Sequence, residues 1–204
     1  MTGVTDGVVG GPSPLSANLL FAALLVFLAL DVVAVRAATG AWLRTRSKQD
    51  NFTYWIIQAS QGVGLGLALG APRWLPGLDI GGPNAATVAP ALVLMAAGTV
   101  VRVSSVLTLG RYFNREVEVR ADHRVVSTGL YGWVRHPSYT GALLVFLGFS
   151  LGQANWLSLV AGIAFPAAGY IWRMKSEEAV LIGALGDDYR SYAATRKRLV
   201  PGLY

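Results

Sequence analysis

Residues 139–172 read YTGALLVFLGFSLGQANWLSLVAGIAFPAAGYIW, and this apolar stretch decides the fold. A helix needs about 20 apolar residues to cross a hydrocarbon core of about 30 Å, so the stretch is too long for one crossing. The turn-forming residues Gly152–Asn155 divide it into two arms. The pattern predicts a tight helical hairpin in a membrane, whose arms need not both cross fully and whose second arm bends at Pro166.

Three further apolar stretches precede this hairpin, and each is long enough to cross a membrane once. They are Leu15–Val35, Phe52–Ala71 and Thr87–Leu109. The sequence therefore predicts an all-α integral membrane protein with five transmembrane helices. No internal repeat or low-complexity linker divides the chain, so residues 1–204 are expected to form a single domain.

The composition agrees with a membrane protein and excludes several kinds of site. Of 204 residues, 53% are hydrophobic and only 14% are charged, against roughly 25% charged in a typical soluble domain. The chain has no cysteine and two histidines. Disulfides, thiolate zinc sites and cysteine nucleophiles are therefore excluded, and no metal site is expected.

The positive charges predict the orientation of the helices. Lys and Arg number four in 36–50, five in 110–137 and six from Arg173 onward, whereas 72–86 holds only Arg73. Basic segments stay in the cytoplasm, so the N-terminus is expected outside and the C-terminus inside, in the inner membrane if the cell is bacterial. The same segments explain the net charge of +6 through lipid headgroups, and no nucleic-acid partner is expected.

Two patterns within the membrane helices predict packing. Gly62, Gly66 and Gly70 recur every fourth residue, which lines one helical face with glycine and favours close approach by a neighbouring helix. Asp31 and Arg102 both lie toward the cytoplasmic ends of their helices. We expect them to form a structural ion pair rather than part of a transport pathway.

Polar residues concentrate in 111–139 and 173–198, which both fall on the cytoplasmic side. Such clustering predicts a site there. In the first segment, a proline at 137 suits the first turn of a helix whose free N–H groups would face a ligand. A plain helix start, with the arginine at 135 reaching the headgroups, explains the pattern equally well.

The second polar segment predicts a site residue pair and a surface helix. Arg173 and Glu177 are four residues apart and share a helical face. They either pair with each other or contribute to the site at the membrane boundary. From Glu177 to about Arg198 an apolar stripe with flanking basic residues predicts one interfacial helix. The stripe consists of Leu181, Leu185, Tyr189 and Tyr192.

Taken together, the two polar segments resemble the isoprenylcysteine carboxyl methyltransferase family. The resemblance rests on GRYFN at 110–114, VVSTGLY at 125–131 and RHPSYTG at 135–141, followed by RMKSEE at 173–178 and GDDY at 186–189. It covers roughly residues 95–204. The RHPxYxG element with a downstream double glutamate is specific in combination.

This resemblance implies a membrane methyltransferase that uses S-adenosylmethionine and releases S-adenosylhomocysteine. Residues 1–109 would supply three membrane helices, and 110–204 the cofactor-binding catalytic region with its pocket at the cytoplasmic side. The implied cofactor contacts are Glu118, His123, Arg124, Val125, Val126, Tyr131, His136, Pro137, Ser138, Tyr139 and Glu177. Arg173 corresponds to the substrate-side arginine, and Arg135 is a second candidate. The acceptor would be a lipophilic or lipidated molecule, carrying a carboxylate that needs no general base.

Three alternatives remain at this stage. A phospholipid or small-lipophile N-methyltransferase would keep the fold and cofactor but would lack a carboxylate-binding arginine, so Arg173 argues against it. A nicotinamide-dependent membrane reductase would usually have more membrane helices than 204 residues supply. A non-enzymatic scaffold or transporter would be expected to carry more polar residues at mid-membrane.

Overall fold

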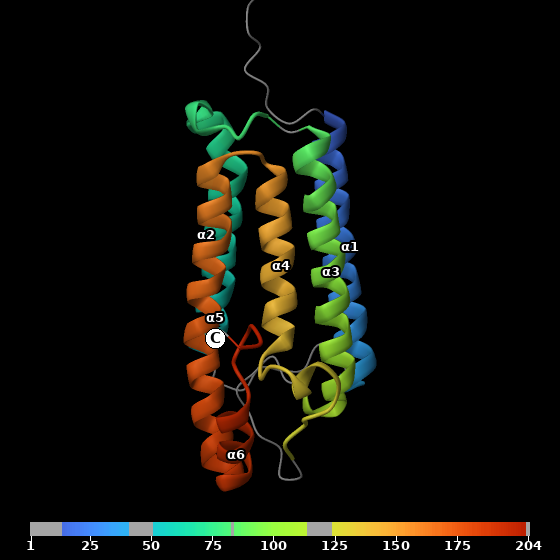
Figure 1. Ribbon diagram of the computed structural model, residues 1–204, viewed down its shortest axis with the longest axis vertical. Helices are drawn as coiled ribbons and strands as arrows, with labels where there is room; N and C mark the ends of the chain where they lie inside the picture. The colour runs from blue at the N-terminus through green and yellow to red at the C-terminus, as the bar shows by residue number, and fades with distance from the viewer. Residues whose placement is uncertain (1–13, 41–50, 83, 114–123, 203–204) are drawn as a thin grey trace, which may run out of the picture.

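The computed structural model describes residues 14–40, 51–82, 84–113 and 124–202. Within these ranges the chain is all-helical, apart from two isolated backbone bridges. The long helices, which run side by side along one axis (Figure 1), are α1 Pro14–Thr39, α2 Asn51–Trp74, α3 Ala85–Leu109, α4 Pro137–Gly152 and α5 Trp156–Leu185. The short helices are η1 Pro76–Leu78, η2 Gly110–Tyr112, η3 Gly129–Gly132 and α6 Asp187–Thr195.

The helices α4 and α5 form the hairpin predicted from the sequence. Between them, Asn155 caps α5 by accepting hydrogen bonds from the backbone N–H groups of Leu157 and Ser158, at 3.0 and 3.3 Å. Pro137 is the first residue of α4, where its missing N–H costs nothing. α5 then continues through Pro166 and ends only at Leu185.

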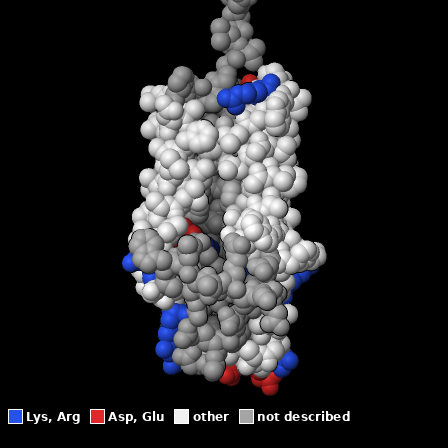
Figure 2. Space-filling view, turned by 180° about the vertical axis from the view of Figure 1, so that it is seen from behind, with Lys and Arg blue, Asp and Glu red and all other residues white. Residues whose placement is uncertain are grey.

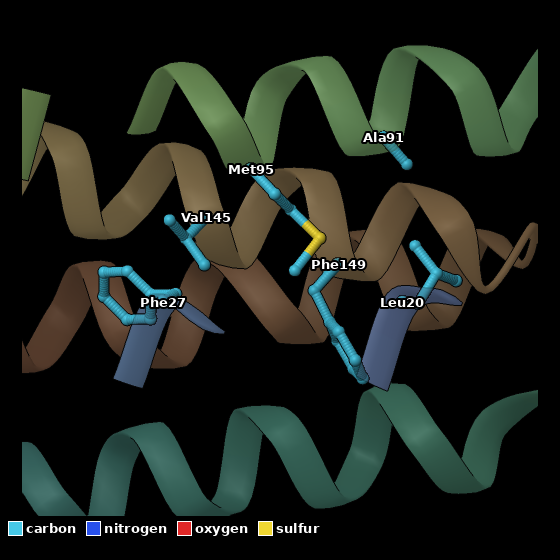
Figure 3. Packing of buried hydrophobic residues seen from close by; sticks show 6 residues of the cluster. All are labelled: Leu20, Phe27, Ala91, Met95, Val145 and Phe149. Carbon is cyan, nitrogen blue, oxygen red and sulfur yellow. The ribbon is translucent and has the colours of Figure 1, made fainter. Parts of the chain in front are cut away.

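The central helix is α4, which packs against both α3 and α5, while α1 packs on α3 and α2 on α5 (Figure 1). Glycines bring α3 and α4 together: a Cβ at Gly98 would lie 2.5 Å from the Gly141 carbonyl oxygen, and one at Gly148 would lie 2.5 Å from the Ala91 oxygen. The adjacent core contains Met95 and Phe149. Figure 3 shows this core with its further members Leu20, Phe27 and Val145.

The predicted glycine face of α2 is not a packing face. A Cβ at Gly62 or Gly66 would meet no atom within 4 Å, and the nearest atoms to one at Gly70 belong to Trp74 of the same helix. The close approach to α5 occurs instead at Gly64, where a Cβ would lie 2.8 Å from Pro166 Cδ. The prediction was wrong because the spacing of small residues does not fix how an apolar helix is rotated toward its neighbour.

The outer surface of the bundle is apolar between its ends. Leu25, Val93 and Val100 are 66%, 67% and 64% exposed, and Figure 2 shows an uncharged band between charged ends. Water would disfavour so much contiguous apolar surface, whereas lipid would not. Among the described residues, three helices are long and apolar enough to cross a membrane, Leu15–Thr39, Ala85–Tyr112 and Trp156–Leu185, and α4 is a shorter apolar helix.

The C-terminal segment differs from the single interfacial helix that the sequence predicts. Residues 177–185 continue α5, and Gly186 then ends that helix with a φ of +56°, a conformation that glycine adopts without strain. Only Asp187–Thr195 form the separate helix α6. Residues 197–199 are not helical: the Lys197 and Arg198 carbonyls accept hydrogen bonds from the N–H groups of Arg135 and His136, both at 2.9 Å. We call residues 197–199 the C-terminal strap.

Candidate active site

One cavity of about 570 Å³ reaches from the end of the bundle that holds α6 into the space between the helices. Its walls come from α1, α2, α3, α4, α5 and α6 and from the segment 124–136. Figure 2, which views the molecule from the side opposite to Figure 1, shows a hollow in which charged atoms are visible. The volume lies within the usual range of about 300–1,000 Å³ for ligand pockets.

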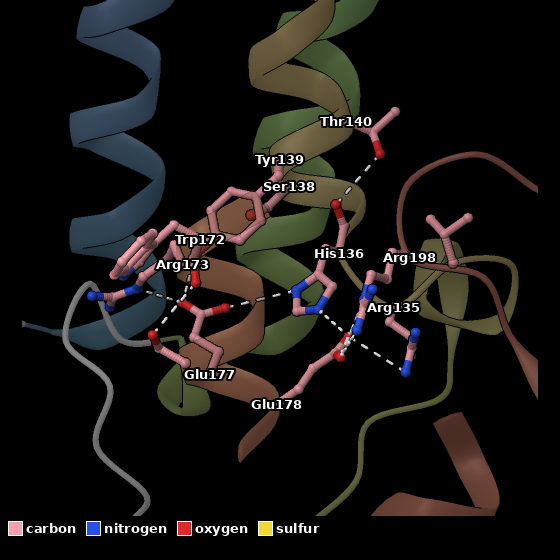
Figure 4. A network of polar contacts seen from close by, with 12 residues as sticks. Arg135, His136, Ser138, Tyr139, Thr140, Trp172, Arg173, Glu177, Glu178 and Arg198 are labelled. Atoms are coloured by element: carbon pink, nitrogen blue, oxygen red, sulfur yellow. Dashed lines mark hydrogen bonds and ion pairs between the residues drawn. The ribbon is translucent and has the colours of Figure 1, made fainter. Parts of the chain in front are cut away.

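The polar end of the cavity is organised around Glu178 (Figure 4). Its carboxylate contacts His136 Nε2 at 3.0 Å and the Arg198 guanidinium at 2.8–3.1 Å, and Arg135 Nη1 lies 3.4 Å away. The side chain of Glu178 is only 8% exposed. These contacts join α5, the start of α4 and the C-terminal strap, so they fix the backbone that carries RHPSY.

The contacts of Glu178 also fix the tautomer of His136. A carboxylate held by a guanidinium is ionised and can only accept, so His136 presents an N–H group from Nε2, and in the neutral imidazole Nδ1 is left as an acceptor. His136 Nδ1 faces Glu177 Oε2 at 3.7 Å. When the imidazole is neutral, both atoms are acceptors, and one donor group can bridge them.

Glu177 and Arg173 are paired, as one reading of their spacing predicts. Arg173 Nε donates to Glu177 Oε1 at 2.9 Å, and Tyr139 Oη donates to the same oxygen at 2.5 Å. Arg173 Nη1 also donates to Thr53 Oγ1 of α2 at 2.7 Å. Arg173 is buried, with 1% of its surface exposed. A guanidinium in this setting is a charged donor placed inside the bundle and against the cavity.

The predicted ion pair between Asp31 and Arg102 is confirmed, and it reaches the site. Arg102 Nε donates to Asp31 Oδ1 at 2.8 Å, and its Nη1 donates to Ser138 Oγ at 2.9 Å. The guanidinium therefore links α1 to the first turn of α4. All three side chains line the cavity.

Aromatic rings form a stack along the cavity wall. The His136 and Tyr139 rings are stacked at 5.6 Å, and the Tyr139 and Tyr170 rings at 4.7 Å. Near the C-terminal strap, Tyr192 Oη donates to the Tyr131 carbonyl oxygen at 2.8 Å. Burial raises the pKa of Tyr131, and it raises the pKa of Tyr192 to about 12. Both hydroxyls therefore keep their protons at neutral pH.

The structure brings most of the expected site residues together around this cavity. Those that line it are Arg124, Val125, Val126, Tyr131, Arg135, His136, Ser138, Tyr139, Arg173 and Glu177. Pro137 is not among the lining residues of the described chain and instead starts α4. Glu118 and His123 lie outside the described residues.

Several lining residues were not expected in the site. Asp31, Gln61 and Arg102 were visible in the sequence as polar interruptions of apolar helices, which is the signal that could have found them. Tyr170 lies in an apolar run and gave no signal. Tyr192 was predicted on an apolar stripe, and it does face the cavity, but it packs against protein.

Apolar-faced helices around a cavity with an ionic end define a membrane protein with an amphiphilic cavity. Within this class, residues 91–183 match the family model described as "Isoprenylcysteine carboxyl methyltransferase (ICMT) family". The resemblance predicted from the two polar segments is thereby confirmed. The matched region includes most of α3, all of α4 and most of α5.

Curated relatives agree with the family match. The protein-S-isoprenylcysteine O-methyltransferase of Schizosaccharomyces pombe is 31% identical over 115 residues, which cover 55% of this chain and 48% of that protein. The enzyme of the same name from Xenopus laevis is 33% identical over 114 residues, covering 55% and 38%. Protein-S-isoprenylcysteine O-methyltransferase B of Arabidopsis thaliana is 30% identical over 104 residues, covering 50% and 53%. The match thus spans about half or less of each relative.

A solved structure shows that the similarity of fold extends beyond the matched half. The structure of "the eukaryotic intramembrane Ras methyltransferase ICMT" superposes with a TM-score of 0.68 and 22% identity, covering 92% of this chain and 67% of that one. The N-terminal helices α1 and α2, which lie outside the family match, therefore belong to the shared fold. The chain is an integral membrane protein of this fold.

Proposed function

We propose that the protein transfers a methyl group from S-adenosylmethionine to the carboxylate of a lipophilic acceptor, of the kind found on a prenylated cysteine. The observation that carries the proposal is the continuity of one cavity. Its polar end holds Arg173, Glu177 and His136, and it continues between apolar side chains such as Phe27 and Leu65. A charged head and an apolar chain can occupy such a space together.

The polar end suits the amino-acid part of the methyl donor. His136 Nδ1 and Glu177 Oε2 lie 3.7 Å apart, and with a neutral imidazole an ammonium group that bridges them would satisfy both. The Tyr139 ring lies beside them, in the stack with His136 and Tyr170. When bound, S-adenosylmethionine supplies an electrophilic methyl group on positively charged sulfur.

The buried guanidinium of Arg173 suits the acceptor carboxylate. It would hold one carboxylate oxygen, while the second oxygen forms the bond to the methyl carbon as the carbon–sulfur bond breaks and its electron pair goes to sulfur. The products are a methyl ester and S-adenosylhomocysteine. A carboxylate is already a nucleophile, so no side chain has to remove a proton. Arg135 is the second candidate for this contact, because it lines the same cavity.

We also propose five membrane crossings, with the active site and the C-terminus in the cytoplasm. The candidate spans support three crossings directly. α2 and α4 run parallel to them in the bundle (Figure 1). The last turns of α1, α3 and α5, from which the basic segments of the sequence continue, lie toward the end that holds the site. A reporter fused after Tyr204 would test the orientation, because activity only outside the cytoplasm would contradict it.

The activity can be tested with detergent-purified protein and methyl-labelled S-adenosylmethionine. We expect base-labile label on N-acetyl-S-farnesylcysteine and none on its methyl ester, in which the acceptor oxygen is blocked. Phosphatidylethanolamine serves as the amine acceptor, and label on it instead of the acid would contradict the proposal. Mass spectrometry of the copurifying ligand is an independent check: a nicotinamide nucleotide in place of S-adenosylhomocysteine would overturn the reaction class.

A further inference from the structure

A polar pair in the middle of the bundle, Gln61 of α2 and Tyr170 of α5, faces the cavity. Gln61 Nε2 and Tyr170 Oη are 2.7 Å apart, Tyr170 is 5% exposed, and both residues line the cavity. The same two helices are also joined by Ser158 Oγ, which donates to the Ala68 carbonyl oxygen at 2.7 Å outside the cavity lining. Arg173 and Thr53 join these helices as well, so helix association alone does not explain why a further polar link faces the ligand space.

This pair has more hydrogen-bond donors than it uses. If the amide of Gln61 donates to the phenol oxygen, the hydroxyl hydrogen of Tyr170 is left over; if the phenol donates to the amide oxygen, the amide N–H groups are left over. Within the described part of the chain, neither side chain has another hydrogen-bond partner. Either orientation thus leaves a donor for a ligand, because an unused buried donor is unfavourable.

The position of the pair indicates which ligand atom it meets. The Tyr170 ring stacks on Tyr139, whose hydroxyl binds the Glu177 oxygen that also accepts from Arg173. Tyr170, Arg173 and Glu177 lie at i, i+3 and i+7 and so share one face of α5. On the other side of the pair the cavity is lined by apolar side chains such as Leu65. The spare donor is therefore placed where an amphiphile changes from its charged head to its chain.

We propose that the Gln61–Tyr170 pair donates a hydrogen bond to the non-reacting oxygen of the acceptor carboxylate and thereby selects carboxylate acceptors. This inference rests on the proposed methyl transfer. Arg173 supplies the charged donor from one side and the pair supplies a neutral donor from the chain side. The other carboxylate oxygen stays unbound and directed toward the methyl carbon, with which it forms the new bond.

The test compares Tyr170→Phe, Gln61→Leu and the double variant with the control Ser158→Ala, which cuts a link between the same two helices outside the cavity lining. Methyl transfer to N-acetyl-S-farnesylcysteine gives KM and kcat, and calorimetry gives the Kd of S-adenosylhomocysteine. We expect KM for the acid to rise about tenfold or more in the single variant that removes the spare donor and in the double variant. A smaller rise is expected in the other single variant, which only releases that donor from its partner, and the cofactor Kd is expected to stay within about twofold. The double variant is expected to be no worse than the worse single variant, because the two residues act as one donor.

Different outcomes contradict different parts of this inference. If the wild type methylates the acid and the pair variants keep its KM, the pair has no role in acceptor binding. If the pair variants and Ser158→Ala lose thermal stability and kcat alike without a change in KM, the pair is only a helix link. If Tyr170→Phe does not fold, the KM of Gln61→Leu decides. If the wild type does not methylate the acid, the proposed function fails first.

Discussion

At the polar end of the cavity, charged side chains from three segments far apart in sequence form ion pairs and hydrogen bonds with one another. At the apolar end, the helices α1 and α2 line the cavity but pack on different neighbours. Glu178 binds His136 and Arg198, which lie 42 residues before it and 20 residues after it. The helices α1 and α2 line the other end but pack on α3 and α5 (Figure 1). Gly62 lines that end, and a Cβ added to it would have no atom within 4 Å.

This difference separates two ways of making a ligand site. A cofactor with many polar groups needs donors and acceptors at fixed positions, and buried ion pairs hold them there. When a substitution removes one partner of such a pair, the other charge stays buried and unpaired, which is strongly destabilising. An apolar chain needs only space and apolar walls, because its contacts have no direction. We therefore expect single substitutions to be severe at the polar end and mild at the apolar end.

The largest effect is expected for Glu178→Gln. The substitution leaves the guanidinium of Arg198 partly buried without its carboxylate, which costs about 3 kcal/mol of the free energy of unfolding, and it frees the tautomer of His136. Thermal unfolding in detergent and calorimetry with S-adenosylhomocysteine measure both consequences. The matched control is Asp187→Asn, because the Asp187–Arg190 pair is exposed. Equal melting temperatures for the two variants would contradict the central role of Glu178.

Glu177→Gln and Arg173→Ala are expected to have separate effects, although the two side chains are paired. The first is expected to weaken S-adenosylhomocysteine binding by about 1.5–3 kcal/mol, or roughly 10- to 150-fold, because a charge-assisted acceptor is lost. The second is expected to spare that affinity and to lower methyl transfer. Calorimetry on both variants distinguishes the cases. An equal loss of affinity in both would mean that the pair acts as a unit and that the two roles are not separable.

Gly98→Ala tests the tight contact between α3 and α4, which supports the polar end. Its Cβ would lie 2.5 Å from the Gly141 carbonyl oxygen, so we expect about 1–3 kcal/mol of destabilisation from overpacking. The control is Gly66→Ala, whose Cβ meets no atom within 4 Å and which is expected to stabilise the helix by about 0.5–1 kcal/mol. Thermal melts of both variants give the comparison. A neutral Gly98→Ala would show that the two helices can separate freely.

Gly62→Leu is expected to have the smallest effect and to act at the apolar end alone. A leucine there would extend into the cavity, so KM for a farnesyl-length acceptor is expected to rise a few-fold, with less effect on a shorter chain and none on cofactor affinity. Gly183→Leu is the control, since Gly183 also has no neighbour within 4 Å and does not line the cavity. A change in cofactor affinity would mean that the two ends are coupled.

The helices of this protein could be read from its sequence because their signals are local. The long apolar runs and the turn at Gly152–Asn155 predict α1 to α5 with ends close to those observed. The sequence RHPSYTG and the i, i+4 spacing of Arg173 and Glu177 placed most of the candidate site. In each case residues near one another in the chain carry the information, since helix length, a proline start and one-turn spacing depend only on neighbours.

Only the tertiary structure decided how those helices are rotated and what their polar residues face. Much of α4 is apolar on every side, and the glycine stripe of α2 faces no helix, so periodicity could not identify the packed faces. The bond between Gln61 and Tyr170 joins residues 109 positions apart. Such contacts depend on the packing of whole helices, which residues near one another in the chain do not reveal. The sequence by itself determined which helices form and which charges lie at their ends; the fold decided which of those charges share a cavity.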